Sequence, residues 1–334
     1  MTRRDVVAIG ASAGGVEALC AVVGALPPGL PAVVLVVLHV PRDAPSALPR
    51  ILSRCGPLPA HHAVHGDPAR LGHIYVAPAD HHLLLTDGRI QLSRGPAENN
   101  HRPAVDPLFR SVARAFGSRA VGVVLSGARD DGTAGLASIK AVGGLAVVQD
   151  PAEAVHPSMP SSAKEHNDID HVLSAAEIGE LIGKLAAASA PSAAGTVDDL
   201  LTAETEMAEF SPMTTDELGA VPAGLACPSC HGSLFDLPGD PVPRFRCRVG
   251  HAWSPETLMA EQGVAMENAL WVALRALEEK SALGHRMAES ATERGNTWAA
   301  RRFADNAAEA KAAGRLVRDL INRIATGPPD PREG

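Results

Sequence analysis

Ser12 lies in a glycine-rich segment that is typical of a nucleophilic serine. The segment Gly10-Ala11-Ser12-Ala13-Gly14 fits the pattern G-x-S-x-G and follows a short apolar run at residues 6–9. At a sharp turn from strand to helix such a serine is exposed, and N–H groups there, that of Ala13 or a neighbour, can stabilise an oxyanion. A nucleotide-binding turn is the alternative, but Ser12 occupies the place where G-x-G-x-x-G needs its second glycine.

Two further polar residues follow apolar runs and could complete a catalytic triad. His39 follows the run at residues 34–38, and Asp131 lies in the loop after residues 121–125. If these runs are parallel strands, Ser12, His39 and Asp131 share the carboxyl edge of the sheet, where open α/β sheets bind ligands. The order Ser, His, Asp differs from the usual α/β-hydrolase order of Ser, acid, His, so a plain α/β-hydrolase is not expected.

The residues alone leave alternatives open for both partners of the serine. His39 could be a strand-end histidine without a catalytic role. Asp131 could be the N-cap of a helix that begins after Gly132, and Asp130 competes with it for the role of the acid.

A cluster of cysteines near the C-terminal third has the spacing of a zinc site. Cys227 and Cys230 form a C-x-x-C pair, and Cys247 and His251 form a C-x-x-x-H pair. Three thiolates and one imidazole complete a tetrahedral site with no position open for water, so the spacing predicts structural rather than catalytic zinc. Free cysteines in a loop-rich segment are the alternative, and both spacings argue against it.

Several other polar residues could bind nucleic acid, substrate or a second metal. Arg244, Arg246 and Arg248 form a local basic patch, but stacking aromatics are limited to Phe245 and Trp253, and the net charge is −8. A protein-interaction or structural role is therefore favoured over nucleic-acid binding. Arg102 is either a substrate contact or a loop anchor. Six histidines lack a repeated ligand spacing and are expected to be solvated or structural: His61, His62, His65, His73, His81 and His82.

The elements that must position these residues alternate between strand and helix. Apolar runs predict strands at residues 6–9, 31–38, 74–77, 121–125 and 145–148. A hairpin is predicted at residues 82–92 with its turn at Asp87-Gly88. Helices are predicted after Gly15, at residues 106–116, after Gly132 and after the capping box of Ser174 and Glu177. The alternation predicts an α/β fold with a doubly wound, mainly parallel, Rossmann-like sheet covered on both faces.

The composition changes along the chain and predicts five segments. We expect a catalytic domain at 1–187, a linker with one short helix at 188–222, a zinc-binding module at 223–253, long helices or a helical hairpin at 254–326 and a disordered tail at 327–334. Ser254-Pro255-Glu256 predicts a helix start, and Gly295 interrupts the helical pattern. No apolar run reaches the roughly 18 residues of a membrane span, and the N-terminus lacks a signal-peptide pattern, so we expect a cytoplasmic protein without membrane insertion.

Five segments of the chain together resemble the chemotaxis protein-glutamate methylesterase family (CheB). They are Ile9–Gly15, Leu38–Pro41, His101–Asp106, Leu125–Gly132 and Met159-Pro160, which occur in family order across about residues 5–185. The resemblance implies that Ser12 is the nucleophile, His39 the general base and Asp131, rather than Asp130, the acid that orients the histidine. It also implies hydrolysis of glutamyl γ-methyl esters on chemoreceptor helices without a catalytic cofactor, and glutamine deamidation as a second reaction.

The chain departs from the family pattern in three respects. Ala13 stands where the family usually has threonine, and Ala128 stands where it usually has methionine, which changes the side chains near the ester. The receiver domain that usually precedes the hydrolase is not expected here, so its control is expected to be missing unless a separate protein supplies it. The C-terminal helices are expected to contact a receptor or a similar coiled-coil protein.

Two other functions remain open from the sequence. The same fold could act as a serine esterase or amidase on another modified protein. Alternatively, the chain could be a non-catalytic signalling scaffold whose working part is the zinc module, although the complete set of Ser12, His39 and Asp131 argues against this.

Overall fold

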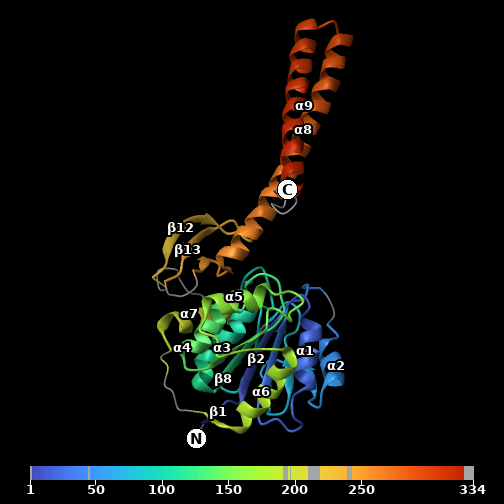
Figure 1. The fold of residues 1–334 in the computed structure, drawn as a ribbon. Coiled ribbons are helices and arrows are strands. Elements are labelled where there is room, and N and C mark those ends of the chain that lie inside the picture. Colours follow the sequence, from blue (N-terminus) through green and yellow to red (C-terminus); the bar gives the residue numbers. More distant parts are fainter. Residues whose placement is uncertain are drawn as a thin grey trace, which may run out of the picture. The chain divides into compact units, whose positions relative to one another are not determined.

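The computed structural model describes residues 2–43, 46–190, 195, 197–209, 219–238 and 243–326. The tail expected to be disordered, 327–334, lies outside the described residues. The chain divides into two compact units, 1–258 and 259–334 (Figure 1). No helix in the described ranges is long and apolar enough to cross a membrane.

The first unit is built on a seven-stranded sheet in the order β10-β9-β8-β2-β3-β5-β4, in which every neighbouring pair is parallel. The strands are β2 (Val6–Ala11), β3 (Val33–Leu38), β4 (Ala60–His62), β5 (Ile74–Val76), β8 (Ala120–Val124), β9 (Leu145–Gln149) and β10 (His171–Leu173). All residues of β2, β3 and β8 are buried, as expected for strands covered on both faces. The predicted fold class is confirmed.

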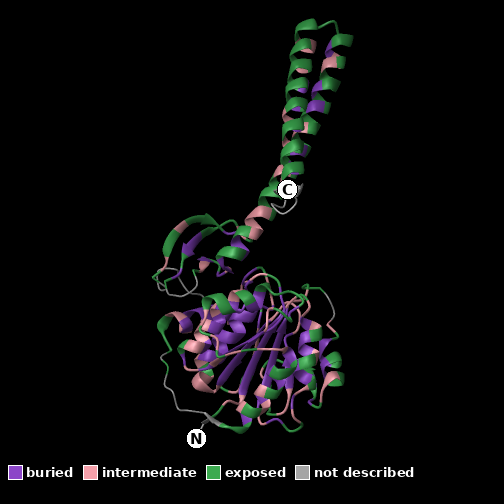
Figure 2. Cartoon of the chain, in the orientation of Figure 1, coloured by how far each residue is buried: buried purple, intermediate pink, exposed green. Residues whose placement is uncertain are grey.

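Helices cover both faces of this sheet and form two separate cores (Figure 2). One core contains α1 (Gly15–Gly24), α2 (Leu48–Cys55) and α6 (Ala175–Ala187), and the other contains α3 (Val105–Phe116), α4 (Thr133–Ala141) and α5 (Ser158–His166). The short 3-10 turn Gly117–Arg119 connects α3 to β8. The cores are aliphatic because the chain has few aromatic residues.

Several local predictions are confirmed. The hairpin consists of β6 (His82–Thr86) and β7 (Arg89–Ser93), and Asp87 and Gly88 both have positive φ, as a tight hairpin turn requires. The capping box of Ser174 and Glu177 begins α6.

Other elements were not predicted from the sequence. They include the short helices α2 and α5 and the short strands β4 and β10. Strands β1 (Thr2–Arg3) and β11 (Ser189–Ala190) pair in an antiparallel manner. The expected linker contains one short helix, as its sequence indicated: α7 (Asp199–Ala208), whose Leu201 is buried in the same core as α3. A disulfide joins Cys20 of α1 to Cys55 of α2, with 5.2 Å between their Cα atoms.

The remainder of the first unit is a small four-stranded sheet. Its strands are β12 (Val221–Ala226), β13 (Ser233–Asp236), β14 (Phe245–Cys247) and β15 (Ala252–Trp253), in antiparallel order. Leu234, Trp253 and Leu258 form its core together with the cysteines. This sheet carries the predicted metal ligands, and we call residues 221–258 the Cys3His module.

The second unit is a helical hairpin. Helix α8 (Pro255–Glu293) begins within the first unit, and α9 (Thr297–Thr326) follows a turn in which Gly295 has φ 69°. Within this unit the Ser281 hydroxyl donates to the Ala307 carbonyl at 3.0 Å. Small side chains let the two helices approach closely, because a Cβ on Gly284 would lie 2.9 Å from that of Ala307.

Candidate active site and metal site

Ser12 is the first residue after β2 and lies in a tight turn. Its N–H donates to the Ser126 carbonyl at 2.9 Å, and its own carbonyl accepts from the N–H of Gly15 at 2.9 Å. Gly14 has φ +67°, a conformation that favours glycine. Ser12 is half-buried and Ala13 is exposed. The sequence therefore forms the strand-to-helix turn that was expected to expose a nucleophile.

The second glycine that this site requires is Gly127, in the loop after β8. A Cβ at this position would lie 2.0 Å from Met159 Sδ and 2.9 Å from Ser12 Cβ. No side chain fits between them, so the loop passes directly beside the serine. The segments around Ser12, Gly127 and Met159, far apart in the sequence, meet at this point.

His39 follows β3 at the same sheet edge. The register pairs Ala11 with Leu38, and the His39 N–H donates to the Ala11 carbonyl at 3.1 Å. The ring Nε2 lies 2.7 Å from Asp131 Oδ2, and the side chains are only 5% and 2% exposed. A carboxylate can only accept, so Nε2 carries the proton and Nδ1 is the acceptor. Nδ1 is buried and has no hydrogen-bond partner among the described residues.

Asp131 is held by donors from the start of α3. Its Oδ2 accepts from the Val105 N–H at 2.7 Å, and its Oδ1 accepts from the Asp106 N–H and from Asn99 Nδ2, each at 3.2 Å. Burial alone would raise the pKa of Asp131, but the hydrogen bond and charge of His39 and the Val105 N–H outweigh it and hold the pKa below its usual range. The carboxyl group therefore stays ionised beside the imidazole.

Asp130 has a different environment. Its Oδ1 accepts from the hydroxyls of Ser254 at 2.8 Å and Thr257 at 2.9 Å, and burial raises its pKa. The structure thus places Asp131, and not Asp130, against His39. The catalytic roles of Ser12, His39 and Asp131 stay predictions: His39 and Asp131 are hydrogen-bonded, and His39 Nδ1, which would face the serine, has no hydrogen-bond partner among the described residues.

Three side chains around this site, two of them buried and His101 half-buried, were not singled out from the sequence. His101 stacks on His39 with 3.6 Å between ring centroids, and burial lowers its pKa to about 4. Asp106 accepts from the N–H of Gly135 at 2.7 Å, and burial, followed by the charge of Asp131, raises its pKa well above the usual value. Asn99 is 4% exposed and bridges Asp106 and Asp131. The one sequence signal near them was the segment His101–Asp106, which resembles the family and contains two of the three residues.

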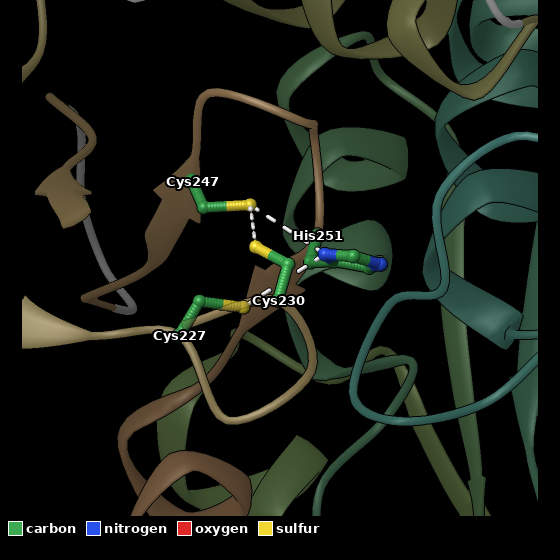
Figure 3. Close-up of side chains that lie close together, drawn as sticks. All are labelled: Cys227, Cys230, Cys247 and His251. Carbon is green, nitrogen blue, oxygen red and sulfur yellow. Dashed lines mark hydrogen bonds between the residues drawn. The ribbon is translucent and has the colours of Figure 1, made fainter. Parts of the chain in front are cut away.

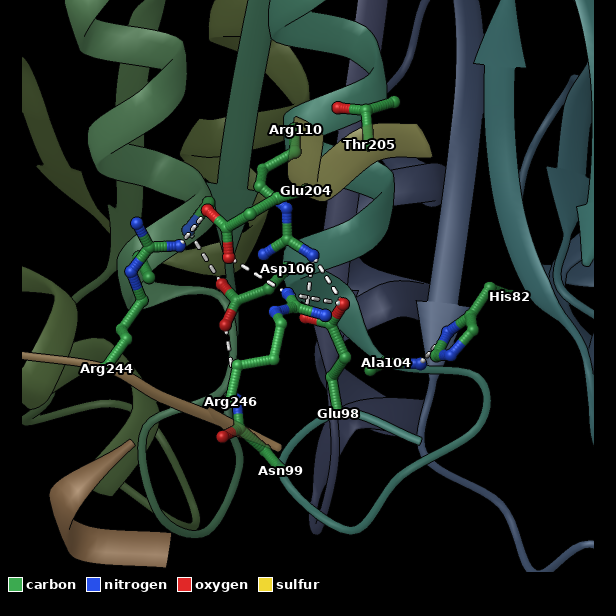
Figure 4. Close-up of polar contacts among 12 residues, drawn as sticks. His82, Glu98, Asn99, Ala104, Asp106, Arg110, Glu204, Thr205, Arg244 and Arg246 are labelled. Carbon is green, nitrogen blue, oxygen red and sulfur yellow. Dashed lines mark hydrogen bonds and ion pairs between the residues drawn. The ribbon is translucent and has the colours of Figure 1, made fainter. Parts of the chain in front are cut away.

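The basic patch expected from Arg244, Arg246 and Arg248 is not a free surface, which corrects that interpretation. Arg246 is 1% exposed and lies 3.1 Å from Glu98 and 2.9 Å from Glu204 (Figure 4). Arg244 also contacts Glu204. Arg248 lies over the Phe235 ring. The positive charges at 244 and 246 are thus neutralised by carboxylates from elsewhere in the unit.

Arg102 and His82 have structural surroundings. Arg102 donates to Asp80 at 2.6 Å and to the Gly95 carbonyl at 2.8 Å, as expected of a loop anchor. His82 is fully buried, with Nε2 3.0 Å from the Pro96 carbonyl. Among the described residues, the Cys3His cluster is the only group with His, Cys, Asp or Glu donors placed to hold a metal.

The four predicted metal ligands come together (Figure 3). Their ligand atoms all lie within 4.8 Å of one another. His251 Nδ1 lies 3.8 Å from Cys227 Sγ and 3.5 Å from Cys247 Sγ, and Cys230 Sγ lies 3.6 Å from Cys247 Sγ. A tetrahedral zinc with bonds of about 2.3 Å needs ligand separations of about 3.7 Å. The donor set therefore fits a metal ion.

The residues around this cluster also suit a metal. Trp253 Nε1 donates to Cys227 Sγ at 3.3 Å, and the Cys247 N–H donates to the His251 carbonyl at 3.1 Å. Such contacts orient ligands and stabilise thiolate charge. Burial of Cys227 and Cys247 limits the access of water.

Comparison with known proteins covers the first half of the chain. Residues 7–182 match the family model for the CheB methylesterase. A protein-glutamate methylesterase/protein-glutamine glutaminase 2 of Anaeromyxobacter dehalogenans is 41% identical over 183 residues, which are 55% of this chain and 54% of the relative. A putative protein of the same name from Leptospira interrogans is 36% identical over 54% of this chain and 94% of the relative.

A solved structure supports the same relationship. The crystal structure of the Thermotoga maritima CheB methylesterase catalytic domain has a TM-score of 0.53 and 33% identity, and the match covers 55% of this chain and 99% of that one. The chain spans about half the length of several curated relatives that it matches.

Proposed function

This chain belongs to the CheB methylesterase family, and on that premise we propose that it is a serine hydrolase that cleaves glutamyl γ-methyl esters on chemoreceptors. The observation that carries the proposal is the buried His39–Asp131 pair, 2.7 Å apart, at the same sheet edge as Ser12. Because relatives are named both methylesterase and glutaminase, the proposal includes deamidation of receptor glutamines as a second reaction.

In the acylation step His39 acts as the general base through Nδ1, because Nε2 is engaged by Asp131. Nδ1 takes the proton of the Ser12 hydroxyl while Oγ bonds to the ester carbonyl carbon, whose oxygen becomes an oxyanion. Asp131 stabilises the imidazolium that forms. The bond to the methoxy group then breaks, and Nδ1 gives its proton to the departing methanol.

In the deacylation step water replaces methanol. His39 Nδ1 takes a proton from water while the water oxygen bonds to the acyl carbon. The bond between the acyl carbon and Ser12 Oγ then breaks, Nδ1 returns the proton to Oγ, and the glutamate is released.

The oxyanion donors are proposed from the turn after β2. The N–H groups of Ser12 and Gly15 are already engaged, by the carbonyls of Ser126 and Ser12. Those of Ala13 and Gly14 have no backbone acceptor in the described part of the chain. We assign the oxyanion contact to one or both of them. The exposed methyl groups of Ala13 and Ala128 leave that donation intact and leave room for the substrate helix.

The remaining assignments extend the proposal beyond the hydrolase. Residues 1–187 form the catalytic domain, and 223–253 hold a structural zinc through Cys227, Cys230, Cys247 and His251. The segment 188–222 includes α7, which packs into the core of the hydrolase through Leu201 and so is part of that domain. The helices of 254–326 meet a coiled-coil receptor, and the protein acts in the cytoplasm.

Methanol release from a methylated chemoreceptor tests the function. Wild type should release methanol, and Ser12→Ala should lower the rate by at least about a thousandfold. Ser138→Ala is a matched control, because within the described part of the chain that hydroxyl donates only to the Ala134 carbonyl of its own helix. Hydrolysis of a model ester without receptor activity would indicate a different substrate. Equal rates for wild type and Ser12→Ala would contradict the proposal.

A further inference from the structure

The Cys3His module lies directly against the loop that carries Asn99. The Asn99 N–H donates to the Ala252 carbonyl at 2.8 Å, and Glu98 and Ala252 form a parallel β-bridge. Ala252 follows the metal ligand His251, and β15 pairs with β14, which ends at Cys247. The loop of the hydrolase is thus one residue away from a ligand of the metal site.

The Asn99 side chain connects this module to the proposed catalytic acid. Its Oδ1 accepts from the Ser254 N–H at 2.9 Å, and its Nδ2 donates to Asp131 Oδ1 at 3.2 Å. An asparagine amide has a donor end and an acceptor end, so a donor on one side fixes which end meets the other side. If the amide turned over, its oxygen would face a carboxylate, which cannot donate to it.

The module has further contacts that keep Ser254 in this position. The Ser254 hydroxyl donates to Asp130 Oδ1 at 2.8 Å and accepts from the N–H of Thr257 at 3.1 Å, which caps the start of α8. The Thr257 hydroxyl also donates to Asp130. Ser254 and Thr257 are 7% and 1% exposed. The helix start is therefore fastened to the residue next to Asp131.

We propose that Asn99 is a positioning residue of the hydrolase site and that the metal-bound Cys3His module sets its orientation through Ser254. This inference rests on the proposed function of Ser12, His39 and Asp131. In it, Asn99 holds the Asp131 carboxylate in the plane that His39 Nε2 needs. Loss of the metal frees β15, the amide loses its fixed orientation, and turnover falls. The module then links metal supply to esterase activity within one chain.

The test compares Asn99→Gly with Asn100→Gly in the full chain. Both residues have positive φ, 50° and 65°, so glycine keeps either backbone conformation without strain, and Asn100 is exposed. With p-nitrophenyl acetate as the probe, we expect Asn99→Gly to lower kcat by about tenfold or more with KM nearly unchanged. Asn100→Gly should match wild type.

The metal is tested in the same variants. Wild type is treated with a zinc chelator and then supplied with Zn²⁺. We expect chelation to lower kcat, Zn²⁺ to restore it, and neither to change Asn99→Gly further, because this variant already lacks the side chain that connects Ser254 to Asp131. Equal kcat for the two glycine variants, or a wild type indifferent to chelation, would overturn the proposal.

Two readouts do not depend on activity. The low-field proton resonance of the His39–Asp131 hydrogen bond should shift in Asn99→Gly and in chelated wild type, and amide exchange at residues 98–106 should increase on chelation. If wild type hydrolyses nothing, the proposed function has failed, and these readouts still decide the positioning role: unchanged signals would refute it.

Discussion

Arg246→Met should destabilise the first unit by removing the central cation of a buried charge network. The Arg246 guanidinium, 1% exposed, donates to the Gly250 carbonyl at 2.8 Å, to Glu204 at 2.9 Å and to Glu98 at 3.1 Å. Methionine fills similar space but leaves two buried carboxylates with fewer partners. Burial alone would raise the pKa of Glu98, but the charges of Arg110 and Arg246 lower it, so the carboxyl group is ionised in the native protein.

The size of the expected loss in stability depends on the ion pairs that Glu98 and Glu204 keep in the variant. Breaking a buried ion pair costs about 3–5 kcal/mol. In Arg246→Met, Glu98 still forms an ion pair with Arg110 at 2.6 Å, and Glu204 still forms one with Arg244. We therefore expect a loss in the free energy of unfolding near the lower end, about 3 kcal/mol. Arg114→Met is the matched control, because the Arg114–Glu206 pair spans 3.1 Å but is 30% and 38% exposed and should contribute at most about 1 kcal/mol.

Urea unfolding followed by tryptophan fluorescence measures this difference. Trp253 is 2% exposed within the Cys3His module, whereas Trp271 and Trp298 are exposed. Replacing the latter two by phenylalanine leaves one reporter of the relevant unit. If Arg246→Met and Arg114→Met differ by less than about 1 kcal/mol, the reasoning is refuted, because the network would not hold the module to the hydrolase.

Three further outcomes are expected. Gly127→Ala should cost about 1–3 kcal/mol in urea unfolding and lower kcat, because the new methyl would meet Met159 and Ser12, whereas Gly263→Ala, which has open space around it, should cause no loss. His101→Gln should reduce the loss of stability at acid pH. The pKa of His101 is about 4 in the folded protein against 6.5 for a free histidine, so its contribution to stability is complete above pH 6.5 and is lost as the pH falls toward 4. Between pH 7 and pH 5, urea titrations should therefore show that wild type loses about 2 kcal/mol more free energy of unfolding than the variant. Cys247→Ser should abolish the binding of one zinc per chain, measured by spectrophotometric zinc release, and a full zinc content in this variant would exclude Cys247 as a ligand.

Local patterns in the sequence were enough for the main elements. Continuous runs of valine and leucine predict buried parallel strands because such residues suit a sheet covered on both faces, and β2, β3 and β8 follow that prediction. The capping box at Ser174 and the Asp87-Gly88 turn depend only on neighbouring residues. The spacing of the cysteines likewise predicted a group that the structure brings together.

Elements with weak local signals required the tertiary structure. The sequence indicated one short helix within residues 188–222 without its bounds, and in the structure α7 is capped by Asp198 and buries Leu201 in the core that contains α3. The Cys20–Cys55 disulfide links positions 35 residues apart.

The polar surroundings of the candidate site were decided by the chain path. The sequence predicts a basic surface patch from the arginines at positions 244, 246 and 248. In the structure, however, Arg246 is buried against Glu98, which lies 148 residues earlier in the chain. In the same way Ser254 reaches Asn99 across 155 residues. Sequence by itself determined the buried strands β2, β3 and β8, the turn at Ser12 and the metal-ligand spacing, because these depend on near neighbours. Only the fold could decide which buried charges meet and what orients Asp131, because desolvation and pairing depend on residues that the sequence separates.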